Sequence, residues 1–132
     1  MRIMIDTNVL VSAVYNPSSK PAQAVRDVCE NHEIVLCDHI ITECFNVVER
    51  KFPQHTPVLD KLLTSLSYSL AIAPSDSGAI ITDPKDAPIL ESAILENVDI
   101  IISGDGHFLS LDMERPKVLT PAQYLETTEP KE

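Results

Sequence analysis

Basic residues are scarce in this sequence, which has 10 lysines and arginines against 20 aspartates and glutamates and a formal net charge of −10. A surface with this balance repels polyanions over most of its area. It therefore argues against a protein that binds nucleic acid through a broad basic face. It does not exclude an enzyme that contacts phosphates at one metal-loaded site, because bound divalent cations invert the electrostatics of their surroundings.

Long hydrophobic runs and paired cysteine motifs are also missing. No apolar run approaches the roughly 18 residues that a membrane-spanning helix needs. The three cysteines, Cys29, Cys37 and Cys44, form no C-x-x-C pair and have apolar neighbours, so we expect small buried side chains in a reducing compartment. A strand-like run starts almost at Met1, which leaves no stretch typical of a signal peptide. These features predict a cytoplasmic protein without a membrane segment.

The length and composition fit one compact domain. A chain of 132 residues with a hydrophobic fraction of 44% can bury one core but is too short for two ordinary domains. The charged fraction of 23% is close to that of globular proteins. We predict a single domain over residues 1–126 and a polar C-terminal tail over residues 127–132.

Short apolar runs alternate with amphipathic stretches along the chain. The strands are predicted over residues 3–5, 34–37, 70–73, 100–102 and 118–119. Helices are predicted over residues 21–31, 39–51, 83–97 and 121–125, and another starts at Thr56. Asp38 and Thr56 are predicted as N-caps. This alternation predicts βαβ units in an α/β fold, with a parallel sheet flanked by helices on both faces in three α/β/α layers.

Four acids occupy special places in this alternation. Asp6 ends the first strand, and Glu43 lies one turn into the helix after the second. Asp86 lies in the first turn of the helix before the fourth strand, and Asp105 follows that strand. The carboxyl ends of parallel strands share one edge of a sheet. We therefore expect the four carboxylates to lie close together.

Clustered carboxylates repel one another unless a cation offsets their charge. Mg²⁺ and Mn²⁺ do this well, because they prefer oxygen ligands and retain several waters. One or two such ions activate water, hold a phosphodiester and stabilise the leaving oxygen. The acids thus predict metal-dependent phosphoryl or phosphodiester chemistry.

Several of these residues also fit ordinary structural roles. Asp83 and Asp86 both suit a helix start, and Asp83 fits the N-cap better. Asp105 also fits a turn, and Glu43 also fits a solvated helix position. His107 suits metal ligation or substrate contact, but a packed or solvated side chain is the commoner case. The sequence around His39 and His55 shows no pattern that indicates a functional site.

In combination, four stretches make the chain resemble the PIN domain, and within that family the VapC-like toxins of toxin–antitoxin pairs. The resemblance extends from Met1 to about Leu125. Its first and last pieces are the most specific. The four stretches are IDTNVLVSA at residues 5–13, ITECFNVVERK at 41–51, DPKDAPILESAI at 83–94 and DIIISGDGHFLSL at 99–111.

This resemblance implies an acidic Mg²⁺ or Mn²⁺ site that cuts RNA by metal-assisted hydrolysis, without a covalent enzyme intermediate. The residues that match the family's four acids are Asp6, Glu43, Asp86 and Asp105. By the same resemblance, Asp6, Asp86 and Asp105 are the implied metal ligands. Asn8 and Ser103 match polar residues that orient carboxylates or water. Water, oriented by Asp105 or Glu43, would attack the phosphorus in line.

The resemblance also implies biological partners. It predicts an endoribonuclease toxin whose substrate is RNA. Toxins of this kind are usually neutralised by a protein antitoxin whose tail fills the site. They also often form homodimers or higher homo-oligomers.

Three other functions compete with this one. A phosphatase of the haloacid-dehalogenase type needs a second aspartate two residues after Asp6, and position 8 is Asn. A phospho-receiver needs a central strand-end aspartate and a later strand-end lysine, and Asp38 and Lys117 are poorly placed for these roles. A non-catalytic PIN-like module that binds RNA or protein stays open, although all four acids are present.

Overall fold

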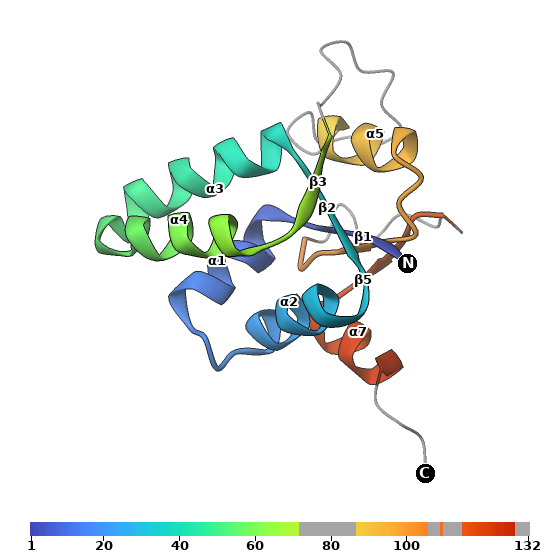
Figure 1. Ribbon diagram of the computed structural model, residues 1–132, viewed down its shortest axis with the longest axis horizontal. Coiled ribbons are helices and arrows are strands. Elements are labelled where there is room, and N and C mark those ends of the chain that lie inside the picture. Colours follow the sequence, from blue (N-terminus) through green and yellow to red (C-terminus); the bar gives the residue numbers. More distant parts are fainter. Residues whose placement is uncertain (72–86, 106–108, 110–114, 129–132) are drawn as a thin grey trace.

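The strands of this protein lie side by side in one parallel sheet with the order β3-β2-β1-β4-β5 (Figure 1). A computed structural model describes residues 1–71, 87–105, 109 and 115–128. The strands are β1 (Arg2–Ile5), β2 (Glu33–Cys37), β3 (Tyr68–Ala71), β4 (Ile100–Ile102) and β5 (Lys117–Leu119). Parallel pairing, confirmed for every neighbouring pair, means that the carboxyl ends of all these strands lie at one edge.

Helices connect the strands and cover the sheet. They are α1 (Thr7–Tyr15), α2 (Lys20–Asn31), α3 (Asp38–Lys51), α4 (Thr56–Ser65), α5 (Ala87–Leu95) and α7 (Pro121–Thr128), with a short 3-10 turn, η1 (Pro53–His55). The chain steps from β1 to β2 to β3 in one direction and from β4 to β5 in the other. Right-handed crossovers then place α1 to α4 on one face and α5 on the other. Figure 1 shows α1 and α4 to the left of the strands and α5 to their upper right. The predicted α/β fold is confirmed.

The core is centred on β1, which has a neighbour on each side. Ile3, Met4 and Ile5 are fully buried, and Met4 pairs with Val35 of β2 and Ile101 of β4. A strand covered by helices on both faces has no polar side, which explains why the apolar run is unbroken. The run ends at the edge of the sheet, and the next residue is Asp6.

Some local predictions were wrong. No pattern predicted α1, which follows β1 after a single residue. Cys37 and His55 occupy the N-cap positions, so Asp38 and Thr56 are first helical residues instead. Asp38 still supports the helix start, because its carboxylate accepts a hydrogen bond from the His39 N–H at 2.9 Å.

Other elements differ in extent or burial from the prediction. Strand β3 ends at Ala71, and residues 72 and 73 lie outside the described residues. Cys29 is exposed, whereas Cys37 and Cys44 are buried as predicted. Helix α7 extends to Thr128, two residues into the expected tail; the division at residue 126 stays a prediction. In the part of the chain that is described, no helix is both long and apolar enough to cross a membrane.

Candidate active site

The direction of the strand connections reverses between the neighbouring strands β1 and β4, whose carboxyl ends lie at the same edge of the sheet. These neighbours send their connections in opposite directions, β1 toward β2 and β4 toward β5. Open α/β sheets bind ligands at such a reversal. Asp6 directly follows β1 and Ser103 directly follows β4, and the Asp6 N–H donates to the Ile102 carbonyl at 3.0 Å. The topology therefore brings two residues 97 positions apart to one point.

Asp6 is fixed in place by hydrogen bonds to both carboxylate oxygens. It is the N-cap of α1, and its Oδ1 accepts from the Thr7 N–H at 2.8 Å. Its Oδ2 accepts from the Ser103 hydroxyl at 2.8 Å. Only 3% of Asp6 is exposed. The start of a helix also favours a negative charge, so this short loop holds a buried carboxylate in one orientation.

Ser103 links Asp6 to the next acid along the chain. Its side chain is completely buried. While its hydroxyl donates to Asp6, its oxygen accepts from the Asp105 N–H at 3.0 Å. Ser103 thus fixes the orientation of the Asp6 carboxylate and the position of the Asp105 backbone. The supporting role that the resemblance implied for Ser103 stays a prediction, and these two hydrogen bonds are the contacts through which it would act.

The surroundings of Asp6 disfavour its charged form. Burial raises the pKa of Asp6 above its ordinary value, and the hydrogen bonds from Ser103 and Thr7 lower it. The negative charges of Asp105 and Glu43 raise this pKa further. Three of the four predicted acids therefore lie near enough to interact. The raised pKa shows that the protein groups around Asp6 stabilise its charge incompletely, which a cation would correct.

Glu43 projects from α3 and has a partner that sequence reasoning missed. Its Oε1 lies 2.8 Å from the Nε2 of His39, one turn earlier on the same helix. The ring nitrogen does not meet hydrogen-bond geometry in this contact, so it is a close electrostatic contact. The signal was present in the sequence, since residues four apart on a helix face each other.

Cys44 lies beneath these acids and takes no part in nucleophilic chemistry. Burial, followed by the charges of Asp6 and Glu43, raises the pKa of Cys44 to about 12. A thiol in such surroundings stays protonated at neutral pH and is therefore a poor nucleophile. The chemistry available at this edge is therefore that of carboxylates.

Of the remaining predicted site residues, only Asn8 lies within the part of the chain that the structure describes. Asp86 lies outside the described residues, as do Asp83 and His107. Asn8 is exposed in the first turn of α1, and within the described ranges no hydrogen bond links its side chain to an acid.

The acids present have the right chemistry for a hard divalent cation. Among the described residues, no group of three or more His, Cys, Asp or Glu side chains is arranged to hold a metal ion. Asp6, Asp105 and Glu43 nevertheless offer only carboxylate oxygens, which Mg²⁺ and Mn²⁺ prefer. A bound cation would stabilise the buried negative charge of Asp6. The donor set therefore fits such an ion, with Asp86 as the predicted further ligand.

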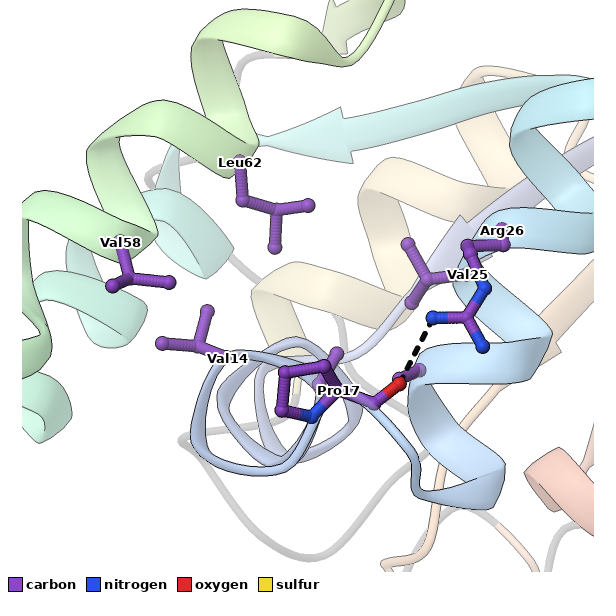
Figure 2. Close-up of a pocket in the computed structure, with 8 residues that line it drawn as sticks. Val14, Pro17, Val25, Arg26, Val58 and Leu62 are labelled. Carbon is purple, nitrogen blue, oxygen red and sulfur yellow. Dashed lines mark hydrogen bonds between the residues drawn. The ribbon is translucent and has the colours of Figure 1, made fainter.

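A concave feature away from the acids lies between α1, α2 and α4, and none of its described lining residues is an acid (Figure 2). Its volume is about 270 Å³. Arg26 points along its rim and donates a hydrogen bond to the Pro17 carbonyl at 2.9 Å. We call this feature the apolar groove; its lining residues are Ala13, Val14, Pro17, Ala22, Val25, Arg26, Val58 and Leu62. Its chemistry suits docking rather than catalysis.

Solved structures with the same fold come from toxin–antitoxin systems. A chain in the crystal structure of VapBC2 from Rickettsia felis, bound to a DNA fragment from its promoter, has a TM-score of 0.68. It is 16% identical, and the match covers 91% of this chain and 98% of that one. VapC20 of Mycobacterium tuberculosis, a Sarcin-Ricin loop cleaving toxin, has a TM-score of 0.60 at 10% identity. That match covers 79% of this chain and 90% of VapC20.

Sequence comparison assigns the family. An uncharacterised protein of Methanocaldococcus jannaschii is 29% identical over 145 aligned positions, which cover 98% of this chain and 92% of the relative. The sequence model of the PIN domain matches residues 2–107, a range that includes β1, β4 and all four predicted acids. The chain therefore belongs to the PIN domain family.

Proposed function

We propose that this protein is a metal-dependent endoribonuclease that hydrolyses RNA phosphodiester bonds, and that it is the toxin of a toxin–antitoxin pair. The observation that carries the proposal is the buried Asp6 carboxylate, fixed by Ser103 and Thr7 beside Asp105 and Glu43. PIN domains are typically Mg²⁺-dependent nucleases. The likeness to VapC20, a Sarcin-Ricin loop cleaving toxin, supports RNA as the substrate.

In this proposal each of the site residues has a separate role. Asp6, Asp86 and Asp105 are the proposed ligands of Mg²⁺ or Mn²⁺. When bound, the ion would supply Lewis-acid stabilisation of the charge that develops on the phosphate. Ser103 and Thr7 each occupy one lone pair on a different oxygen of Asp6, which leaves lone pairs free for a cation. Glu43 or Asp105 orients the attacking water and accepts its proton.

Metal dependence is the first expected result. The purified protein should cut a labelled RNA mixture with Mn²⁺ or Mg²⁺, stop cutting in excess EDTA, and resume when Mn²⁺ is restored. Gel analysis of the products after a fixed time measures this. Well-folded protein that cuts nothing with either metal, even at high concentration, would overturn the nuclease proposal and favour the non-catalytic binding module. Cutting that persists in EDTA would contradict the carboxylate–metal mechanism.

The phosphatase alternative loses its support at this point. A haloacid-dehalogenase-type site needs a second aspartate at position 8, and this position holds the exposed Asn8. The PIN domain match covers the same stretch of chain.

The apolar groove is the proposed docking surface for an antitoxin helix. Its walls are mainly apolar, and Val58 on α4 is 46% exposed although it is a hydrophobic residue. The likeness to a chain of the VapBC2 complex supports an antitoxin as the occupant. The net charge of −10 favours a partner with basic segments around its apolar face. The predicted homodimer or higher homo-oligomer stays a prediction.

Val58→Asp should weaken antitoxin binding at least about tenfold, because it places a charge in the groove where an apolar side chain would be buried. The partner is isolated from the native host as a protein that inhibits RNA cleavage, and its Kd is then measured by calorimetry. Leu95→Asp is the matched control, since Leu95 is a helical leucine with 68% exposure on α5. An inhibitor that binds Val58→Asp as tightly as the wild type would show that the antitoxin docks elsewhere.

A further inference from the structure

His39 makes one contact that the proposed mechanism does not use. Its Nε2 lies 2.8 Å from Oε1 of Glu43, and about a third of each side chain is exposed (33% and 34%). The Nε2 atom itself is buried. The imidazole is therefore turned inward, with this nitrogen against the carboxylate and away from water.

The chemistry of the two groups fixes which atom carries the proton. An ionised carboxylate only accepts hydrogen bonds, so the nitrogen that faces Glu43 must bear a hydrogen. His39 is therefore expected in the Nε2–H form whenever the ring is neutral.

The helix directs this pair toward the acids. Side chains on an α-helix lean toward its N-terminus, so Glu43 lies over the turn that contains His39. That turn is the start of α3, which follows β2 at the edge where Asp6 lies. The charge of Glu43 reaches Asp6, since it raises the pKa of that carboxyl. The contact between His39 and Glu43 therefore lies at the start of α3, at the same edge of the sheet as Asp6.

We infer that His39 is a positioning residue that holds the Glu43 carboxylate at the catalytic edge, an inference that rests on the proposed nuclease function. Without His39, the side-chain torsions of Glu43 are free and its carboxylate samples solvent-facing rotamers. His39 itself does not touch the reacting atoms. Residues that orient a catalytic carboxylate in this way typically account for roughly 10- to 100-fold in activity.

The experiment compares His39→Ala with His39→Gln, because the glutamine amide supplies an N–H donor at similar reach. Cleavage of an RNA that the wild-type protein cuts is followed with saturating Mn²⁺. We expect His39→Ala to lower kcat about tenfold without changing KM, and His39→Gln to stay within about threefold of the wild type. In a Glu43→Gln background, measured under single turnover with excess enzyme, His39→Ala should have no further effect.

A matched control separates this effect from simple helix stabilisation. Asn31 and Asp27 form another pair with the same spacing on α2, joined by an Asn31 Nδ2 to Asp27 Oδ1 hydrogen bond of 3.0 Å. Asn31→Ala removes that pair far from the acids and should leave kcat unchanged. If the role of His39 is purely structural, His39→Ala should shift the unfolding temperature and leave kcat unchanged, which is also the result expected for Asn31→Ala.

A second readout does not depend on cleavage. The ¹H–¹⁵N spectrum of the His39 imidazole in metal-free protein should show the Nε2–H form, and Glu43→Gln should shift its signals. Wild-type cutting that is unchanged in His39→Ala would overturn the inference and leave the nuclease proposal intact. Loss of cutting that persists in the Glu43→Gln background would also overturn it, because His39 would then act without Glu43. A wild-type protein that cuts no RNA would overturn the nuclease proposal and the catalytic role of His39 with it.

Discussion

Replacing Asp6 with asparagine is expected to lower RNA cleavage about 1,000-fold or more and to make the metal-free protein more stable. The loss of activity follows from removing the one carboxylate that both the sheet topology and its hydrogen bonds place at the centre of the acids. Asparagine has nearly the same shape as aspartate. It therefore removes the charge and keeps the packing, which isolates the electrostatic contribution of this side chain.

The gain in stability follows from the raised pKa of Asp6. The folded state retains the proton at pH values where an unfolded carboxyl, with its ordinary pKa of 3.8, has lost it. The stability that this protonated group contributes is full below pH 3.8 and is lost as the pH rises through the raised folded-state pKa. At pH 7.5 the wild type has lost this contribution, whereas asparagine has no proton to lose. One cost opposes the gain, because the amide introduced by Asp6→Asn reverses the hydrogen bond with Ser103.

Thermal unfolding in EDTA across a pH series measures this effect. Asp6→Asn should unfold at a higher temperature than the wild type at pH 7.5, and the difference should shrink as the pH falls toward 3.8. Added Mn²⁺ should stabilise the wild type and not the variant, since a ligand stabilises only the state that binds it. Asp60→Asn, at an exposed position of α4, is the matched control and should change neither quantity. A destabilised, fully active Asp6→Asn protein would refute the role given to Asp6.

The position of Asp6 was readable from the sequence because the signals for it are local. An unbroken apolar run that stops at an acid is typical of a buried parallel strand with that acid at its end. The second run, residues 100–102, carries the same signal and places Ser103 and Asp105. Once both strands are parallel neighbours, their ends coincide without further information. This part of the site therefore follows from strand geometry alone.

The contacts made by helices were harder to predict because they depend on side-chain direction. Helix α1 has only nine residues and follows β1 after the single residue Asp6, which leaves no loop to mark its start. The apolar run at its start reads equally well as strand or helix. The His39–Glu43 contact needs the exact helix register, and the N-cap of α3 fell one residue earlier than the sequence suggested.

The burial of individual side chains was the hardest property to predict from the sequence. Asp6 is 3% exposed and Cys29 is exposed, yet both stand next to apolar residues in the sequence. The difference arises from tertiary packing: Asp6 lies between β1, β4 and α1, while Cys29 faces outward from α2. The pKa of Asp6, and so its effect on stability, follows from this burial. The direction of this pKa shift therefore depends on the tertiary structure and not on the neighbours of Asp6 in the sequence.

Ser103→Ala is expected to lower cleavage by roughly 10- to 100-fold at neutral pH, through the two acids that Ser103 holds in place. The substitution removes the hydroxyl that donates to Asp6 Oδ2 at 2.8 Å and the oxygen that accepts the Asp105 N–H at 3.0 Å. Asp6 then has one oriented oxygen instead of two, and the backbone before Asp105 loses its anchor. Both proposed ligands become less well placed, so the apparent affinity for Mn²⁺ should fall together with kcat.

The pH dependence gives this variant a signature that a merely destabilised protein lacks. The Ser103 hydrogen bond lowers the pKa of Asp6, so its removal must raise that pKa further. Because Asp6 must be deprotonated to bind a cation, the acid limb of the cleavage profile at subsaturating Mn²⁺ should move to higher pH. Ser19→Ala removes a comparable pair of bonds, to Ala22 N and Asn16 O, at the start of α2. It should cost similar stability, about 1 kcal/mol, without moving the limb. If the limb of Ser103→Ala coincides with that of the wild type, Asp6 is not the group whose protonation limits cleavage.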